Sequence, residues 1–213
     1  MGDFIYYLNM KLYLEDIKKA TWVDEQYKKW IDSYFERHYP NDAPKWMSMK
    51  ESVFCYEFYK NLRQTMEGNL AKYGNLCFHA EITKRLSETG KEIYRPDFVL
   101  HGGQDNSDKQ LIAIEVKTSD RIPVNKTGQE NLLEDIKALI AYIEELKYEM
   151  GLFICVNKTT IDLRKNVKCV YKLNKDKEFK TDDNTLGKIY FIGTDSENEE
   201  IEHFTLLDVS KSE

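Results

Sequence analysis

The sequence predicts a mixed α/β domain whose central sheet is flanked by helices. Two strand-like segments, residues 93–100 and 111–116, are separated by a cluster of turn-forming residues, which predicts an antiparallel hairpin with a long loop. An amphipathic segment at 129–149 and a fully apolar segment at 152–156 follow, which predicts a helical crossover to a strand buried on both faces. Because a hairpin and a crossover share one sheet, that sheet has to be mixed.

Further elements are predicted on either side of this centre. Residues 1–46 are rich in aromatic residues at helical spacing, which favours a helical extension packed on the core over a partner-binding surface. A helix at 49–67 and a strand at 76–82 precede the hairpin. Residues 47–213 then form the main domain. Its C-terminal part is expected to contribute three more strands, at 167–173, 188–192 and 203–209.

Composition limits the class of protein. With 213 residues, 41% hydrophobic and 13% aromatic, the chain is long and apolar enough to bury a core. No apolar run approaches the roughly 20 residues of a membrane span, and the N-terminus does not resemble a signal peptide, so no membrane partner is expected. The net charge of −6 argues against a protein that coats nucleic acid by bulk attraction, but it does not exclude a nuclease.

The cysteines predict a reducing compartment. None of the four is spaced as a CxxC pair, and each lies in an apolar stretch. We therefore expect buried free thiols and a cytoplasmic protein. The cysteines are Cys55, Cys77, Cys155 and Cys169.

Charged side chains stand where the two hairpin strands meet. Asp97 follows Pro96 at the start of one strand, and Glu115 and Lys117 end the other. Side chains alternate along a strand, so Glu115 and Lys117 share a face, and pairing of the strands can bring Asp97 beside Glu115. Two adjacent carboxylates repel one another unless positive charge lies between them, and a hard divalent cation meets that need. The backbone carbonyl of Val116 can add a third oxygen.

This arrangement predicts metal-assisted hydrolysis. The cation would acidify a bound water and polarise a phosphate. Lys117 would orient the attacking water or offset charge on the phosphate, and its pKa is expected to be depressed by a nearby metal and by burial. Glu51 lies on the apolar face of the 49–67 helix and can reach the metal, or it can simply cap that helix. Glu57 is the substitute if the helix is rotated.

The same residues resemble a known family. Pro96-Asp97 followed by Glu115-Val116-Lys117 resembles the signature of the PD-(D/E)XK nuclease superfamily, and residues 51–63, 79–84 and 133–137 resemble elements of a bacterial subset of it. The resemblance covers roughly residues 49–157. It implies a restriction-endonuclease-like αβββαβ core, dependence on Mg²⁺ with Mn²⁺ as a substitute, and hydrolysis of phosphodiester bonds. Catalysis would then rest on Asp97, Glu115, Lys117 and Glu51.

Several roles stay open at this stage. Glu81 and Lys84 either line the cleft or pair on the surface, and Gln129 either contacts a phosphate or nucleobase or is solvated. Arg95, Arg121 and Lys126 are candidates for backbone contacts. The leading function is a DNA nuclease of the restriction or defence type. The alternatives are an inactive nuclease-fold module that binds nucleic acid or a protein, and an RNA nuclease. Cutting of both DNA strands would suggest a homodimer.

Overall fold

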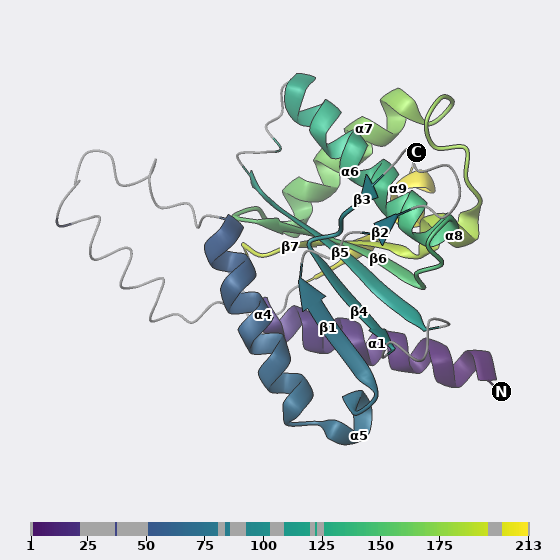
Figure 1. Cartoon of the computed structure of the whole chain (residues 1–213). Helices are drawn as coiled ribbons and strands as arrows, with labels where there is room; N and C mark the ends of the chain where they lie inside the picture. The colour runs from purple at the N-terminus through teal and green to yellow at the C-terminus, as the bar shows by residue number, and fades with distance from the viewer. Residues whose placement is uncertain are drawn as a thin grey trace. The chain divides into compact units, whose positions relative to one another are not determined.

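The structure is a computed structural model that describes residues 2–21, 37, 51–80, 84–85, 93–102, 109–119, 122, 126–195 and 202–212. The chain divides into two compact units, Met1–Gly68 and Asn69–Glu213 (Figure 1). Each unit is described by itself below. The predicted boundary at residue 46 lies outside the described residues and stays a prediction.

The first unit contains two long helices, α1 (Gly2–Ala20) and α4 (Glu51–Glu67). They contact one another, and the Asn61 side chain of α4 donates a hydrogen bond of 3.4 Å to the carbonyl of Ala20 at the end of α1. The buried face of α4 carries Phe54, Phe58, Leu62 and Met66, which recur every four residues, as on one face of a helix. Of the helical extension predicted at residues 1–46, the structure describes residues 2–21 and 37, and the rest lies outside the described residues.

The second unit is built on a mixed sheet of six strands in the order β1-β4-β5-β6-β7-β8. Strands β1, β4 and β5 are antiparallel, β5, β6 and β7 are parallel, and β8 pairs antiparallel to β7. All seven residues of β6 are buried, which confirms a strand at the centre of a mixed sheet. The strands are β1 (Leu76–Ala80), β4 (Phe98–Gly102), β5 (Gln110–Thr118), β6 (Met150–Val156), β7 (Ile189–Gly193) and β8 (Phe204–Thr205).

Two helices, α6 (Lys126–Glu144) and α7 (Thr160–Asn174), connect the parallel strands and pack on the same face of the sheet (Figure 1). Their apolar stripes, which include Leu132 and Ile136 of α6 and Leu163 and Val167 of α7, form the core of this unit together with the sheet. Three short helices complete it: α5 (Leu70–Tyr73), α8 (Asp183–Gly187) and α9 (Leu206–Ser210).

Three sequence predictions of strands are wrong. The segment 167–173 belongs to α7, because the Thr159 side chain caps the helix at the Asp162 amide and the buried residues recur at helical spacing. Most of 203–209 is α9, which begins with a capping box formed by Thr205 and Asp208. The segment 93–100 is broken before Phe98. Its first part forms β3 (Ile93–Tyr94), which pairs with β2 (Lys84–Arg85) in a separate sheet.

The antiparallel hairpin of β4 and β5 and the strand at 188–192 are confirmed. In the part of the chain that the structure describes, no helix is long and apolar enough to cross a bilayer. All four cysteines are free, as predicted, but only Cys155 is buried. Cys55 and Cys77 are half-buried and Cys169 is exposed, which corrects the expectation of four buried thiols.

Candidate functional site

Asp97 directly precedes β4, at the point where the β4–β5 pairing begins along β4. The β4–β5 register pairs Phe98 with Ile114, so the backbone beyond Ile114 has no β4 residue opposite it. Asp97 Oδ2 accepts a hydrogen bond of 2.7 Å from the amide of Val116. A backbone donor that would otherwise lack a partner therefore fixes the Asp97 carboxylate against β5.

The Lys117 ammonium lies among three oxygens. Its Nζ is 3.3 Å from Asp97 Oδ2, 3.1 Å from Glu115 Oε2 and 3.0 Å from the carbonyl oxygen of Val116. Glu115 and Lys117 lie on the same face of β5, as the alternation of the strand predicts. The structure thus brings together the two carboxylates, the carbonyl and the lysine that the sequence singled out.

Glu115 is the buried member of this group, with 6% of its surface exposed. Its Oε1 accepts a hydrogen bond of 2.6 Å from the hydroxyl of Tyr142 on α6. Burial raises the pKa of Glu115 to about 7, although the Lys117 ammonium and the Tyr142 hydrogen bond both lower it. The Glu115 carboxyl therefore changes charge near neutral pH.

Lys117 keeps its proton. Burial lowers its pKa, but the carboxylates of Glu115, Asp97 and Asp135 outweigh that effect and hold the pKa of the ammonium above its usual value. The depressed pKa expected from the sequence is therefore wrong for the chain alone. A lysine that stays charged can donate hydrogen bonds and stabilise negative charge, but it does not act as a base.

Two residues of α6 complete the surroundings of the site, and both were missed in the sequence. Tyr142 bonds to Glu115, and the Asp135 carboxylate raises the pKa of both Lys117 and Tyr142. Burial, followed by the Glu115 carboxylate, raises the pKa of Tyr142 above that of an ordinary phenol. The signal for Tyr142 was its place on the apolar stripe of α6, because a buried tyrosine hydroxyl needs a polar partner.

The donor set fits a hard divalent cation. Carboxylate and carbonyl oxygens are the ligands that Mg²⁺ prefers, and the three oxygens here already surround a positive charge. The described residues contain no group of three or more His, Cys, Asp or Glu side chains arranged for a metal. The predicted set has only two carboxylates, Asp97 and Glu115, with the Val116 carbonyl as its third ligand.

Of the other predicted residues, Glu51 and Glu57 belong to the first unit and Gln129 belongs to the second. Glu51 is half-buried at the first residue of α4, in the first unit, and its position relative to Asp97 is not determined. Glu57 pairs with Lys60 at 3.4 Å on the same helix. Gln129 lies in the first turn of α6 rather than opening it, and its amide donates to the Cys169 thiol at 3.6 Å.

Five further candidates for the cleft or for nucleic acid contacts were named from the sequence. Lys84 lies in β2, opposite Tyr94. Arg95 is exposed, and Lys126 is exposed and pairs with Glu130 at 3.8 Å. Glu81 and Arg121 lie outside the described residues.

No family model, curated protein or solved structure matches this chain.

Removal of the Tyr142 hydroxyl tests its bond to Glu115. We expect Tyr142→Phe to lower the free energy of unfolding by about 1–3 kcal/mol, because a buried carboxylate oxygen loses its donor. Urea unfolding measures this change. Tyr171→Phe is the matched control, since the Tyr171 ring stacks on Phe179 with centroids 5.3 Å apart. Equal losses in the two variants would show that the hydroxyl bond contributes nothing.

The raised pKa of Glu115 predicts a stability that depends on pH. The ordinary pKa is 4.5 and the folded value is about 7, so between them the folded protein holds a proton that the unfolded chain has released. Rising pH then favours unfolding. Relative to Glu115→Gln, the wild type should lose about 3 kcal/mol between pH 4 and pH 8. Urea unfolding of both proteins across this range measures the difference, and a flat difference would contradict the pKa shift.

Proposed function

We propose that this chain is a Mg²⁺-dependent nuclease with a restriction-endonuclease-like αβββαβ core, which hydrolyses phosphodiester bonds in DNA in restriction or defence. The mixed six-stranded sheet with flanking helices supports the fold part of this proposal. The resemblance of Pro96-Asp97 and Glu115-Val116-Lys117 to the PD-(D/E)XK signature supports the chemistry.

One observation carries the proposal. Asp97 Oδ2, Glu115 Oε2 and the Val116 carbonyl all lie within 3.3 Å of one point, the Lys117 Nζ. These oxygens form a donor set suited to a hard cation, and in the chain alone they surround the Lys117 ammonium near the end of β5.

Different residues of the site would have different roles in hydrolysis. Water adds across a P–O bond to give a phosphate monoester and a hydroxyl group. Bound Mg²⁺ would lower the pKa of a water molecule and would stabilise the negative charge of the phosphate oxygens. Asp97 and Glu115 would hold the ion, and the Asp97 orientation is fixed by the Val116 amide at 2.7 Å. Lys117, which stays protonated, would donate to the phosphate and offset its developing charge.

The second candidate is an inactive nuclease-fold module that binds nucleic acid or a partner protein. The Lys117 ammonium itself compensates the two carboxylates, so the folded chain has no uncompensated pair of acids that requires a metal. The net charge of −6 also favours this alternative somewhat.

Incubation of purified protein with supercoiled plasmid in Mg²⁺, Mn²⁺ or EDTA separates these candidates. We expect nicked or linear product with either metal and none with EDTA, since chelation removes the ion that the carboxylates would hold. Asp97→Ala should show no product, while Asp176→Ala, a change of an exposed aspartate, should cleave like the wild type. Identical behaviour of wild type and Asp97→Ala would overturn the catalytic proposal.

Substrate comparison refines the same assay. Cleavage of circular DNA indicates an endonuclease, and cleavage of linear ends alone indicates an exonuclease. Faster cleavage of RNA would replace DNA as the substrate. Binding of nucleic acid without cleavage under any divalent ion would favour the inactive module. A homodimer and a cytoplasmic location stay predictions, the first tied to cutting of both strands and the second to the unpaired cysteines.

A further inference from the structure

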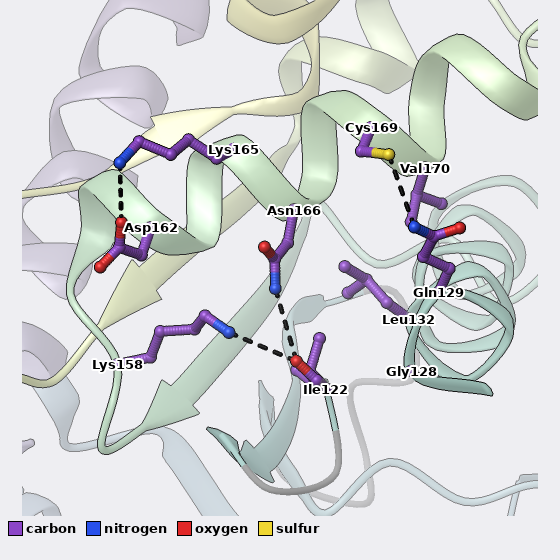
Figure 2. Close-up of a pocket in the computed structure, with 10 residues that line it drawn as sticks. All are labelled: Ile122, Gly128, Gln129, Leu132, Lys158, Asp162, Lys165, Asn166, Cys169 and Val170. Atoms are coloured by element: carbon purple, nitrogen blue, oxygen red, sulfur yellow. Dashed lines mark hydrogen bonds and ion pairs between the residues drawn. The ribbon is translucent and has the colours of Figure 1, made fainter. Parts of the chain in front are cut away.

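A pocket with a volume of about 400 Å³ lies between the N-terminal parts of α6 and α7 (Figure 2). Pockets of about 300–1,000 Å³ are typical of sites for small molecules. The α6 side contributes the apolar Leu132 and the polar Gln129, and the α7 side contributes charged, polar and apolar residues. The lining residues are Ile122, Gly128, Gln129, Leu132, Lys158, Asp162, Lys165, Asn166, Cys169 and Val170.

Three polar side chains of this pocket, those of Lys158, Asn166 and Gln129, hold long hydrogen bonds. Lys158 Nζ and Asn166 Nδ2 both donate to the same acceptor, the carbonyl of Ile122, at 3.3 Å and 3.4 Å (Figure 2). Gln129 donates at 3.6 Å to a thiol, which is a weak acceptor. These distances are long for N–H···O bonds, so a ligand that offers better acceptors can replace them at small cost.

The charge of the pocket favours an anion. Its ionisable groups are Lys158, Lys165 and Asp162, which give a net charge of +1. Asp162 is bonded to Lys165 at 2.9 Å and to the Thr159 hydroxyl at 3.1 Å, so its charge is compensated at the rim. Among the described residues, the Lys158 ammonium is bonded to a carbonyl and to no carboxylate.

The pocket belongs to the same edge of the sheet as the candidate active site. Lys158 follows the carboxyl end of β6, and Ile122 follows that of β5, the strand that carries Lys117. Because β5 and β6 are parallel neighbours, with Lys117 opposite Cys155, these ends lie side by side. In open α/β sheets, ligands bind at the carboxyl ends of the strands.

We propose that this pocket binds a nucleoside monophosphate unit. Lys158 holds the phosphate, and the aliphatic side chains of Ile122, Leu132 and Val170 pack against the base. The side-chain amides of Gln129 and Asn166 offer both donors and acceptors to the edge of the base, as such amides do in reading adenine. The volume exceeds what a lone phosphate needs, and the two lysines and two amides disfavour a purely apolar ligand.

The nucleotide has two possible sources with shared chemistry. It is either a free mononucleotide or one residue of a DNA strand that extends from the candidate active site, and the second source rests on the proposed function. Calorimetric titration in EDTA with the four 5′-deoxymononucleotides, with the matching nucleosides and with inorganic phosphate tests the site itself. Binding needs no cleavage, so the outcome is independent of nuclease activity.

We expect saturable binding of at least one mononucleotide, at least tenfold tighter than that of its nucleoside or of phosphate. Lys158→Ala should weaken it at least tenfold, and Asn166→Leu should reduce the difference between bases. Lys177→Ala, a change of an exposed lysine outside the pocket, is the matched control, and thermal unfolding verifies that all variants fold. Absence of saturable binding of all four mononucleotides, equal binding of phosphate and nucleotide, or indifference to Lys158→Ala in the folded variant would overturn the proposal.

A short single-stranded DNA oligonucleotide identifies the source. If the oligonucleotide competes with the mononucleotide, and the competition is lost in Lys158→Ala, the pocket binds one residue of a DNA strand. Mononucleotide binding without such competition assigns it to a free nucleotide. The Asp97→Ala variant separates the two proposals, because it should bind mononucleotides like the wild type. Unchanged binding together with no cleavage by the wild type would leave the pocket assigned and the nuclease proposal overturned.

Discussion

Lys117→Ala is expected to bind Mn²⁺ at least as tightly as the wild type, while its turnover of DNA falls by about 10³-fold. The reason is that the Lys117 ammonium lies 3.0–3.3 Å from the three oxygens that would ligate the ion. Without the ammonium, the carboxylates of Asp97 and Glu115 lose a competing cation. The phosphate loses the donor that offsets its charge in the transition state, so binding and turnover move in opposite directions.

Calorimetric titration with Mn²⁺ and a plasmid cleavage assay measure the two quantities on the same preparation. Lys188→Ala is the matched control, since Lys188 pairs with Glu149 at 3.4 Å at the start of β7. It should change neither affinity nor turnover. Loss of metal binding in Lys117→Ala would show that the lysine holds the site together rather than acting on the substrate.

Gly193→Ala should destabilise the fold by more than about 3 kcal/mol. A Cβ at this position, the last residue of β7, would lie 2.4 Å from the carbonyl oxygen of Lys158 and 2.5 Å from backbone atoms of Thr159 and Thr160. These are main-chain atoms of the turn into α7, so the clash cannot be relieved by rotation of a side chain. The turn or the strand has to move.

Urea unfolding measures the loss, with Gly187→Ala as the matched control. A Cβ at Gly187 would meet only the Leu207 side chain, at 3.4 Å, which is an ordinary contact. That variant should stay within about 1 kcal/mol of the wild type. A similar small loss in Gly193→Ala would mean that the β6–α7 turn yields easily. In that case the position of Lys158, the pocket residue proposed to bind the phosphate, would also be poorly fixed.

The centre of the fold could be predicted because its strands are short apolar runs bounded by turn-forming residues. All seven residues of β6 are buried, and so are the six consecutive residues Leu111–Val116 of β5. The segment 167–173 failed because its apolar residues also suit a strand. What decides for a helix is the Thr159 cap and the buried Leu163, which lie upstream of that window. Local periodicity alone could not supply that context.

The part of the site that belongs to the β4–β5 hairpin could be predicted from the sequence. Asp97, Glu115 and Lys117 come together because β4 and β5 pair directly, and the register follows from the alternation of the strands. Tyr142 and Asp135 come from α6, and their approach depends on how that helix packs on the sheet. No sequence period encodes that packing. The pocket is harder still, because it is formed by two helices, one of which was predicted as a strand.

The position of Lys117 at the centre of the site bears on whether folding requires a bound metal ion. Because the Lys117 ammonium already pairs with Asp97 and Glu115, we expect the chain to fold without a divalent ion, unlike small zinc domains that unfold when chelated. Under the proposed function, EDTA would abolish nuclease activity and leave the melting temperature unchanged. When divalent ions are depleted, the protein would then stay folded but inactive, and its activity would return when the ions are restored.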